Sequence, residues 1–167
     1  MTISDNCKSA MIEHGVLMKD GKPAGAHLLN KDVLRVAVVS ADEQGQYPEG
    51  FLSEEVRGLI TENFSFGGGE LAAKPAAFSD EIQQEVRDAI GFWREGEIEF
   101  VHFSDDPDVT VFAFHSDVEQ SFATFPINDH ADGSMAGHER AYIGISTLRQ
   151  GETTEELIRH EYGHNIG

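Results

Sequence analysis

The chain of 167 residues has the usual length of a single domain, and its 40% hydrophobic and 25% charged residues are typical of a globular rather than a disordered protein. Thirty acidic residues against twelve basic ones give a formal net charge of −18, which argues against nucleic acid and anionic membranes as partners. The single cysteine, Cys7, excludes an internal disulfide framework, and no apolar run approaches the length of a membrane span.

Residues 1–31 have little hydrophobic pattern and predict an N-terminal extension, with a pro-segment as the alternative. Charged residues such as Asp5, Lys8 and Glu13 interrupt this segment, so it lacks the apolar core of a secretory signal. We therefore expect a protein that is secreted or exported without a visible signal peptide, with the cytoplasm as the alternative location.

The first regular elements are expected after this extension. Residues 32–40, DVLRVAVVS, form a β-branched run that is typical of a buried strand. Residues 52–64 predict a helix with Ser53 at its N-cap. The apolar face of this helix would consist of Leu52, Val56, Leu59 and Ile60.

A glycine triplet and Pro75 then indicate a loop, and the clearest long helix follows at residues 79–96. Ser79 or Asp80 is expected to cap this helix. Its apolar stripe would consist of Ile82, Val86, Ala89, Ile90 and Trp93.

Strands are predicted at residues 98–103 and 108–116, with a turn between them. Residues 122–139 are expected to be irregular, and residues 140–147 form another strand, which we place at an edge of the sheet. Alternation in the second strand divides it into one face with Val109, Val111, Ala113 and His115 and another with Thr110, Phe112 and Phe114.

The last element is a helix that begins with TTEE, in which Thr153 and Glu156 fit a capping box. The order of elements predicts an α/β (α+β) fold in which a twisted mixed sheet packs on two long helices. We expect residues 32–167 to form this one domain, with the candidate chemistry on its last helix.

That helix contains His160, Glu161 and His164 in the sequence HEYGH. Side chains four residues apart project from the same face of a helix, so both imidazoles can reach one metal ion, and neutral imidazole suits zinc. Glu161 lies about 100° further around the helix, where its carboxylate can flank the metal and move protons. A shuffled chain of this composition would contain H-E-x-x-H only about 0.04 times, so the motif predicts metal-assisted hydrolysis.

The sequence HEYGHNIG, residues 160–167, resembles the first eight positions of the metzincin signature H-E-x-x-H-x-x-G-x-x-H/D. The order of elements over residues 79–167 is also similar to the N-terminal half of matrixin and serralysin-like metallopeptidases. This resemblance implies a metzincin-like N-terminal subdomain and a zinc endopeptidase that acts on proteins or peptides. His160 and His164 would then be zinc ligands, Glu161 the general base and acid, and Gly167 the residue at which the chain turns toward a third ligand.

The same resemblance implies that the third ligand lies three residues beyond Gly167, so we expect the chain to end inside the motif, without a C-terminal subdomain. It also suggests that Cys7 could block the zinc as a propeptide thiolate does. The residues around Cys7 lack the propeptide sequence of matrixins, so we expect an idle thiol.

A second metal site is a further expectation, because the segment around residues 115–138 resembles the structural zinc and calcium region of matrixins. The candidate ligands for Zn²⁺ or Ca²⁺ are His115, Asp117, His130 and His138. Polar residues in such a segment also serve as turn residues alone, which is the alternative.

Two other functions are compatible with the sequence. One is a zinc peptidase whose third ligand is a glutamate on a later helix, and the other is a non-catalytic binding module that keeps the last helix for its structure. In the peptidase interpretation, the strand near residues 141–147 would align an extended peptide substrate by β-augmentation. The sequence does not indicate the oligomeric state.

Overall fold

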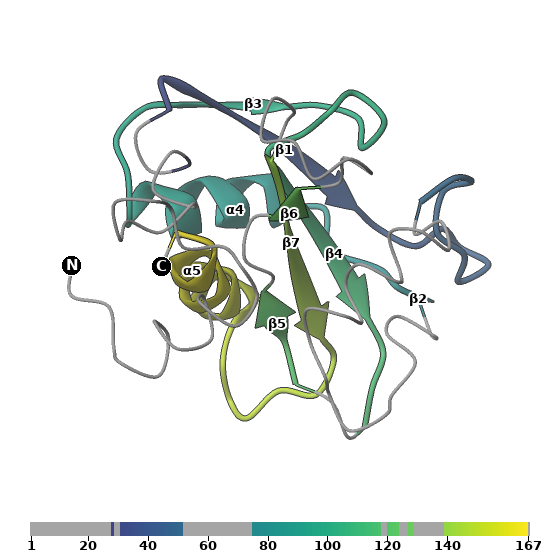
Figure 1. The fold of residues 1–167 in the computed structure, drawn as a ribbon. Coiled ribbons are helices and arrows are strands. Elements are labelled where there is room, and N and C mark those ends of the chain that lie inside the picture. The colour runs from purple at the N-terminus through teal and green to yellow at the C-terminus, as the bar shows by residue number, and fades with distance from the viewer. Residues whose placement is uncertain are drawn as a thin grey trace.

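The computed structural model describes residues 28, 31–51, 75–117, 120–123, 127–128 and 139–166. These residues have a mixed α/β fold, in which a mostly parallel sheet with five strands along its path packs against two helices (Figure 1). The predicted helix at residues 52–64 and the possible roles of Cys7 and Gly167 fall outside the described residues, so those predictions remain untested.

The strands follow the order β3-β1-β4-β7-β5 across the sheet. Their bounds are Val33–Val39 for β1, Glu97–Phe100 for β3, Val109–Phe114 for β4, Phe122–Ala123 for β5 and Glu139–Ser146 for β7. The pairs β1–β3, β1–β4 and β4–β7 are parallel, and β5 runs antiparallel to β7. Two short strands, β2 (Pro75–Ala76) and β6 (Ile127–Asn128), pair antiparallel with β4 and β7.

The strand that we expected at an edge of the sheet lies inside it. β7 has β4 on one side and β5 on the other, so its hydrogen-bonding groups are not free to align a peptide over their full length. The expectation that residues 122–139 are irregular was also wrong where β5 and β6 form. Strands of two residues leave no alternation in the sequence, and β5 is held by packing, since a Cβ on Gly144 would overlap the Phe122 ring.

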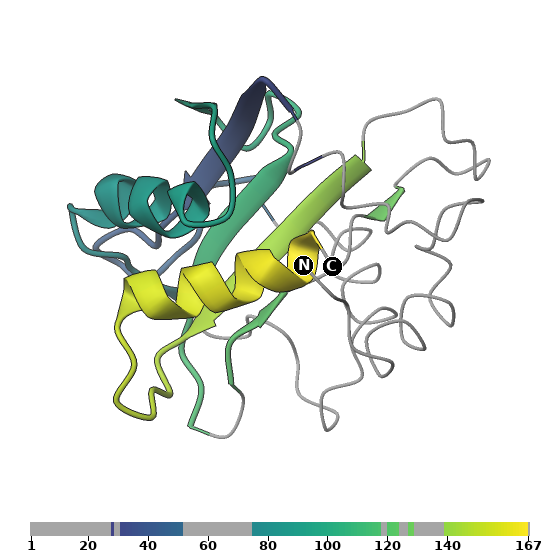
Figure 2. The same ribbon diagram turned by 90° about the vertical axis from the view of Figure 1, so that its left-hand side faces the viewer.

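Both helices cover the same face of the sheet, where the main core lies between the layers (Figure 2). They are α4, Ile82–Gly91, and α5, Thr154–Asn165. The predicted stripe of α4 is confirmed for its four buried members, Ile82, Val86, Ala89 and Ile90. Trp93 lies just beyond the end of α4 and packs, partly buried, against this core.

The predicted cap of α4 was wrong. Glu81 occupies the N-cap position and makes no capping hydrogen bond through its side chain. Ser79 contributes instead through its main chain, because its carbonyl accepts a hydrogen bond from the Ile82 N–H at 3.2 Å. A tight turn therefore satisfies this amide in place of a side-chain oxygen, and the helix begins later than the sequence suggests.

The other face of the sheet carries a cluster of aromatic side chains. Phe112, Phe114, Phe122 and Tyr142 are buried there, with Tyr47, Phe51 and Phe103 packed against them. Val109 and Val111 of β4 belong to the core under the helices. The prediction that β4 has two different faces is therefore confirmed for Val109 and Val111 on one side and for Phe112 and Phe114 on the other.

Contacts from outside the predicted domain reach the core. Leu28 is fully buried, and its carbonyl accepts a hydrogen bond from the Tyr162 hydroxyl at 3.2 Å. Lys31 forms an ion pair with the fully buried Asp108, whose other carboxylate oxygen accepts the Arg35 N–H at 2.8 Å. Residues near the predicted domain boundary thus help to hold β1 and α5 in place. Within the described ranges, neither helix has the length and apolar character needed to cross a bilayer.

Candidate metal centre

The helix α5 begins with the predicted capping box. The Thr153 hydroxyl accepts a hydrogen bond from the Glu156 N–H at 3.2 Å, and the Glu156 carboxylate accepts one from the Thr153 N–H at 2.8 Å. The hydrogen bonds from Thr153 also lower the pKa of the Glu156 carboxyl. A cap of this kind stabilises a helix by about 1 kcal/mol, so it fixes where α5 starts and therefore which residues face the sheet.

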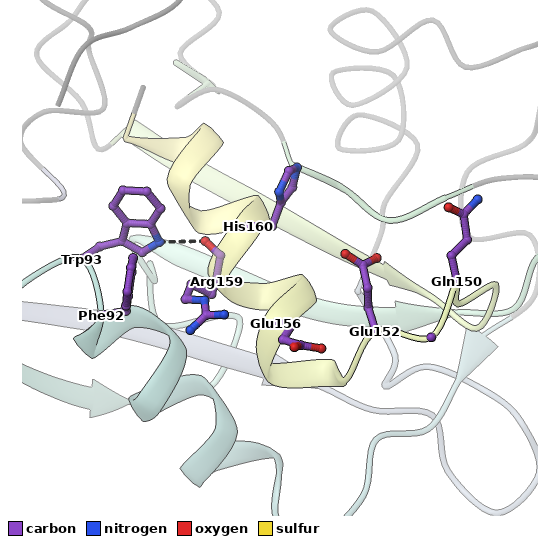
Figure 3. Close-up of a pocket in the computed structure, with 8 residues that line it drawn as sticks. Phe92, Trp93, Gln150, Glu152, Glu156, Arg159 and His160 are labelled. Carbon is purple, nitrogen blue, oxygen red and sulfur yellow. Dashed lines mark hydrogen bonds between the residues drawn. The ribbon is translucent and has the colours of Figure 1, made fainter.

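The rotation of α5 is set near Trp93. The indole Nε1–H of Trp93 donates a hydrogen bond to the Arg159 main-chain carbonyl at 2.7 Å (Figure 3). Gly163 lies against the same ring, and a Cβ at this position would be 2.8 Å from Trp93 Cζ2. Only glycine allows the helix to approach the indole this closely, so the Trp93–Gly163 contact positions the histidines on either side of it.

The Nε2 atoms of His160 and His164 lie 3.1 Å apart, within hydrogen-bonding distance of each other. Two nitrogens held about 2.0–2.1 Å from a tetrahedral zinc ion would be about 3.3–3.4 Å apart, so the pair fits zinc after a small side-chain adjustment. Burial, and then the neighbouring His160, lower the pKa of His164. This shift favours the neutral imidazole, which is the form that binds metal.

Glu161 lies beside this pair and is 7% exposed. Burial raises the pKa of its carboxyl to about 7, with a smaller contribution from the charge of Glu152. A carboxyl with a pKa near neutral pH is present in both protonation states there, so it can accept a proton and release it again.

Two hollows meet at His160. The first has a volume of about 230 Å³ and is bounded by His160 and Glu161 together with Gln120, Ser121, Leu148, Gln150, Glu152 and Leu157. The second, of about 420 Å³, lies toward the end of α4 and contains Phe92, Trp93 and Arg159 (Figure 3). Phe92 is the exposed aromatic here, and the Arg159 guanidinium lies over its ring at 4.9 Å from the centroid. Gln150, Glu152 and His160 border both hollows.

Among the described residues, no three His, Cys, Asp or Glu side chains are grouped closely enough to hold a metal ion. The two imidazoles of α5 are thus the ligands that this part of the chain offers. Of the predicted second site, His130 and His138 lie outside the described residues. His115 Nε2 and Asp117 Oδ1 are 3.8 Å apart, and His115 Nδ1 shares a hydrogen bond of 2.7 Å with the Thr147 hydroxyl. The second metal site stays a prediction.

Comparisons with protein-family models, curated proteins and solved structures find no match for this chain. The argument about its chemistry therefore depends on the geometry of α5 and of the residues around it.

Sequence reasoning missed two contributors to the site. Gly163 could have been noticed, because a glycine inside a helix lowers helix propensity and calls for a packing reason. Glu152 had no such signal, since it is one of thirty acidic residues and becomes distinct only when the fold brings it beside His160.

Proposed function

We propose that the protein is a zinc-dependent hydrolase of peptide bonds, related in architecture to the N-terminal subdomain of metzincin peptidases. The observation that carries this proposal is the convergence of the His160 and His164 Nε2 atoms, 3.1 Å apart, beside the buried carboxyl of Glu161. The parallel strands with an antiparallel outer strand, and the two helices on one face, are compatible with the resemblance of the motif.

His160 and His164 would hold the zinc ion through their Nε2 atoms. When bound, zinc would supply a Lewis acid that polarises a substrate carbonyl and lowers the pKa of water to about 7. Glu161 accepts a proton from water in the adjoining hollow and delivers it to the leaving amine, a role that suits a carboxyl with a pKa of about 7. The Trp93–Gly163 contact keeps these three side chains in register by fixing the rotation of α5.

Two substitutions test the proposal by separating metal binding from proton transfer. His164→Ala should lower zinc affinity by at least about a hundredfold, measured by competition with a chelating dye. Glu161→Gln should retain zinc and lower the cleavage rate of a mixed set of quenched fluorescent peptides by about a hundredfold or more.

The two substitutions also distinguish the alternatives. A non-catalytic binding module would show the same zinc affinity and the same lack of peptide cleavage in the wild type and in both variants. Loss of zinc in His164→Ala without any cleavage by the wild type would point to a structural metal and would contradict the hydrolase.

A further inference from the structure

The smaller of the two hollows borders the candidate metal centre and is polar. His160 and Glu161 line it, the loop before α5 contributes Gln150 and Glu152, and Ser121 comes from the residues just before β5. At about 30 Å³ per water molecule, its volume of about 230 Å³ holds about eight waters or one long side chain. A substrate whose reacting bond lies at His160 and Glu161 would place a neighbouring side chain here.

Glu152 gives this hollow its charge. Among the described residues, no lysine or arginine lines this hollow, and Glu152 has no ion-pair partner there. Figure 3 shows the side chains of Glu152, Gln150 and His160 projecting to the same side of α5. Glu152 also borders the larger hollow, which contains Glu156 and Arg159 as well. The smaller hollow is therefore electronegative and open to a cation.

We propose that Glu152 is a specificity-determining residue that selects peptides with a lysine or arginine side chain beside the bond held at His160 and Glu161. This inference rests on the proposed peptidase function and names its substrate class. Glu152 is exposed and has no other partner among the described residues, so a cationic side chain beside it would gain the modest, salt-sensitive attraction of a surface ion pair. The net charge of −18 attracts the same peptides from a distance.

The experiment measures equilibrium binding of labelled peptides by fluorescence anisotropy, with the whole metal-free chain at low salt. The peptides have the form Ala-Ala-X-Ala-Ala, in which X is lysine, norleucine or glutamate, so that lysine and norleucine compare a charged and an apolar side chain of similar length. We expect the lysine peptide to bind about five- to tenfold more tightly than the norleucine peptide. Glu152→Gln should abolish this preference, and Glu152→Lys should transfer it to the glutamate peptide.

The matched control is Glu155→Gln. It removes the same charge from the first turn of α5, but Glu155 does not line the hollow. The Glu155→Gln control should keep the preference for lysine. If the preference survives Glu152→Gln, or falls equally in both variants, the acidic surface as a whole causes the preference. Either result would overturn the inference. Failure of every peptide to bind would overturn it as well.

The inference and the proposed function fail in different ways. Because binding is measured without metal, it does not depend on turnover. Peptide cleavage that is indifferent to lysine and arginine would refute the subsite and leave the peptidase. A Glu152-dependent lysine preference in a chain that binds no zinc would refute the peptidase and leave the subsite.

Discussion

Replacing Glu161 by glutamine should stabilise the metal-free protein at alkaline pH. The carboxyl of Glu161 has a pKa of about 7 in the folded protein and 4.5 as its ordinary value, mainly because it is buried. A carboxyl whose folded pKa is raised favours folding while it is protonated. That contribution is fully present below pH 4.5 and is lost as the pH rises from 4.5 to 7. Glutamine has nearly the same shape and never ionises, so the variant does not incur this loss.

The magnitude follows from the same pKa values. The shift from 4.5 to about 7 corresponds to roughly 3 kcal/mol once both states are ionised. The variant should therefore be more stable than the wild type by roughly 1 kcal/mol near about pH 5.5 and by roughly 3 kcal/mol near about pH 8.5. The lowest pH of the experiment, about 5.5, lies above the isoelectric point of about 4.6, where the protein is least soluble.

The assay is urea unfolding of both proteins in the presence of a chelator, across this range of pH. Groups that the substitution leaves unchanged titrate in the same way in both proteins. Their contributions therefore cancel when the unfolding free energy of the wild type is subtracted from that of the variant. Glu95→Gln is the control, because it removes an exposed carboxyl from the connection between α4 and β3 and should change stability by less than about 0.5 kcal/mol. A Glu161→Gln effect that is independent of pH, or a variant less stable than the wild type near about pH 8.5, would refute the buried carboxyl on which the proposed proton transfer depends.

Three further substitutions test how the structure holds α5 and the sheet, and each is measured by chemical unfolding. Gly163→Ala should destabilise the protein by about 1–2 kcal/mol, because the clash of its Cβ with the Trp93 ring outweighs the better helix propensity of alanine; equal or higher stability would contradict the close contact. Thr153→Ala should cost about 1 kcal/mol through loss of the capping box, and an unchanged value would mean that water caps the helix as well. Asp108→Asn should cost about 2–3 kcal/mol, because it weakens the ion pair with Lys31 at a fully buried position; a neutral effect would remove this pair from the anchors of β1.

Sequence patterns predicted those features that depend on neighbours along the chain. The capping box of α5 and the buried stripe of α4 are local arrangements, so their residue spacing is sufficient to identify them. The two faces of β4 were predictable for the same reason, because alternation in a strand separates Val109 and Val111 from Phe112 and Phe114.

The order of strands depends on contacts that the sequence does not display. β5 forms because Phe122 packs into the space above Gly144, more than twenty residues further along the chain, and this strand displaces β7 from the edge. The first turn of α4 was mispredicted for a similar reason. Ser79 and Asp80 have side chains that can cap a helix. In the structure, however, the Ser79 main-chain carbonyl accepts the hydrogen bond from the Ile82 N–H.

Within the candidate site, sequence identified the two imidazoles and the carboxylate, because their spacing on one helix is a local property. It could not identify Glu152, which lines the same hollow as His160 from the loop before the helix, nor the burial that raises the pKa of Glu161. Both depend on how α5 packs against the sheet and α4. A motif can therefore name the reacting groups, while their protonation and the shape of the space beside them come from the fold.

Two features of α5 contradict the local rules for a stable helix, and both occur in the five residues from His160 to His164. Gly163 lowers helix propensity in the helix interior, and Glu161 buries a carboxyl that no described cation pairs with. Elsewhere α5 has a full capping box and a buried apolar face, together with the fully buried polar side chain of Asn165. Sites where a sequence departs from local stability are commonly those where function requires the departure. Packing against the Trp93 ring accounts for Gly163, so the buried carboxyl of Glu161 beside the two imidazoles is the departure that the proposed chemical role of this turn would explain.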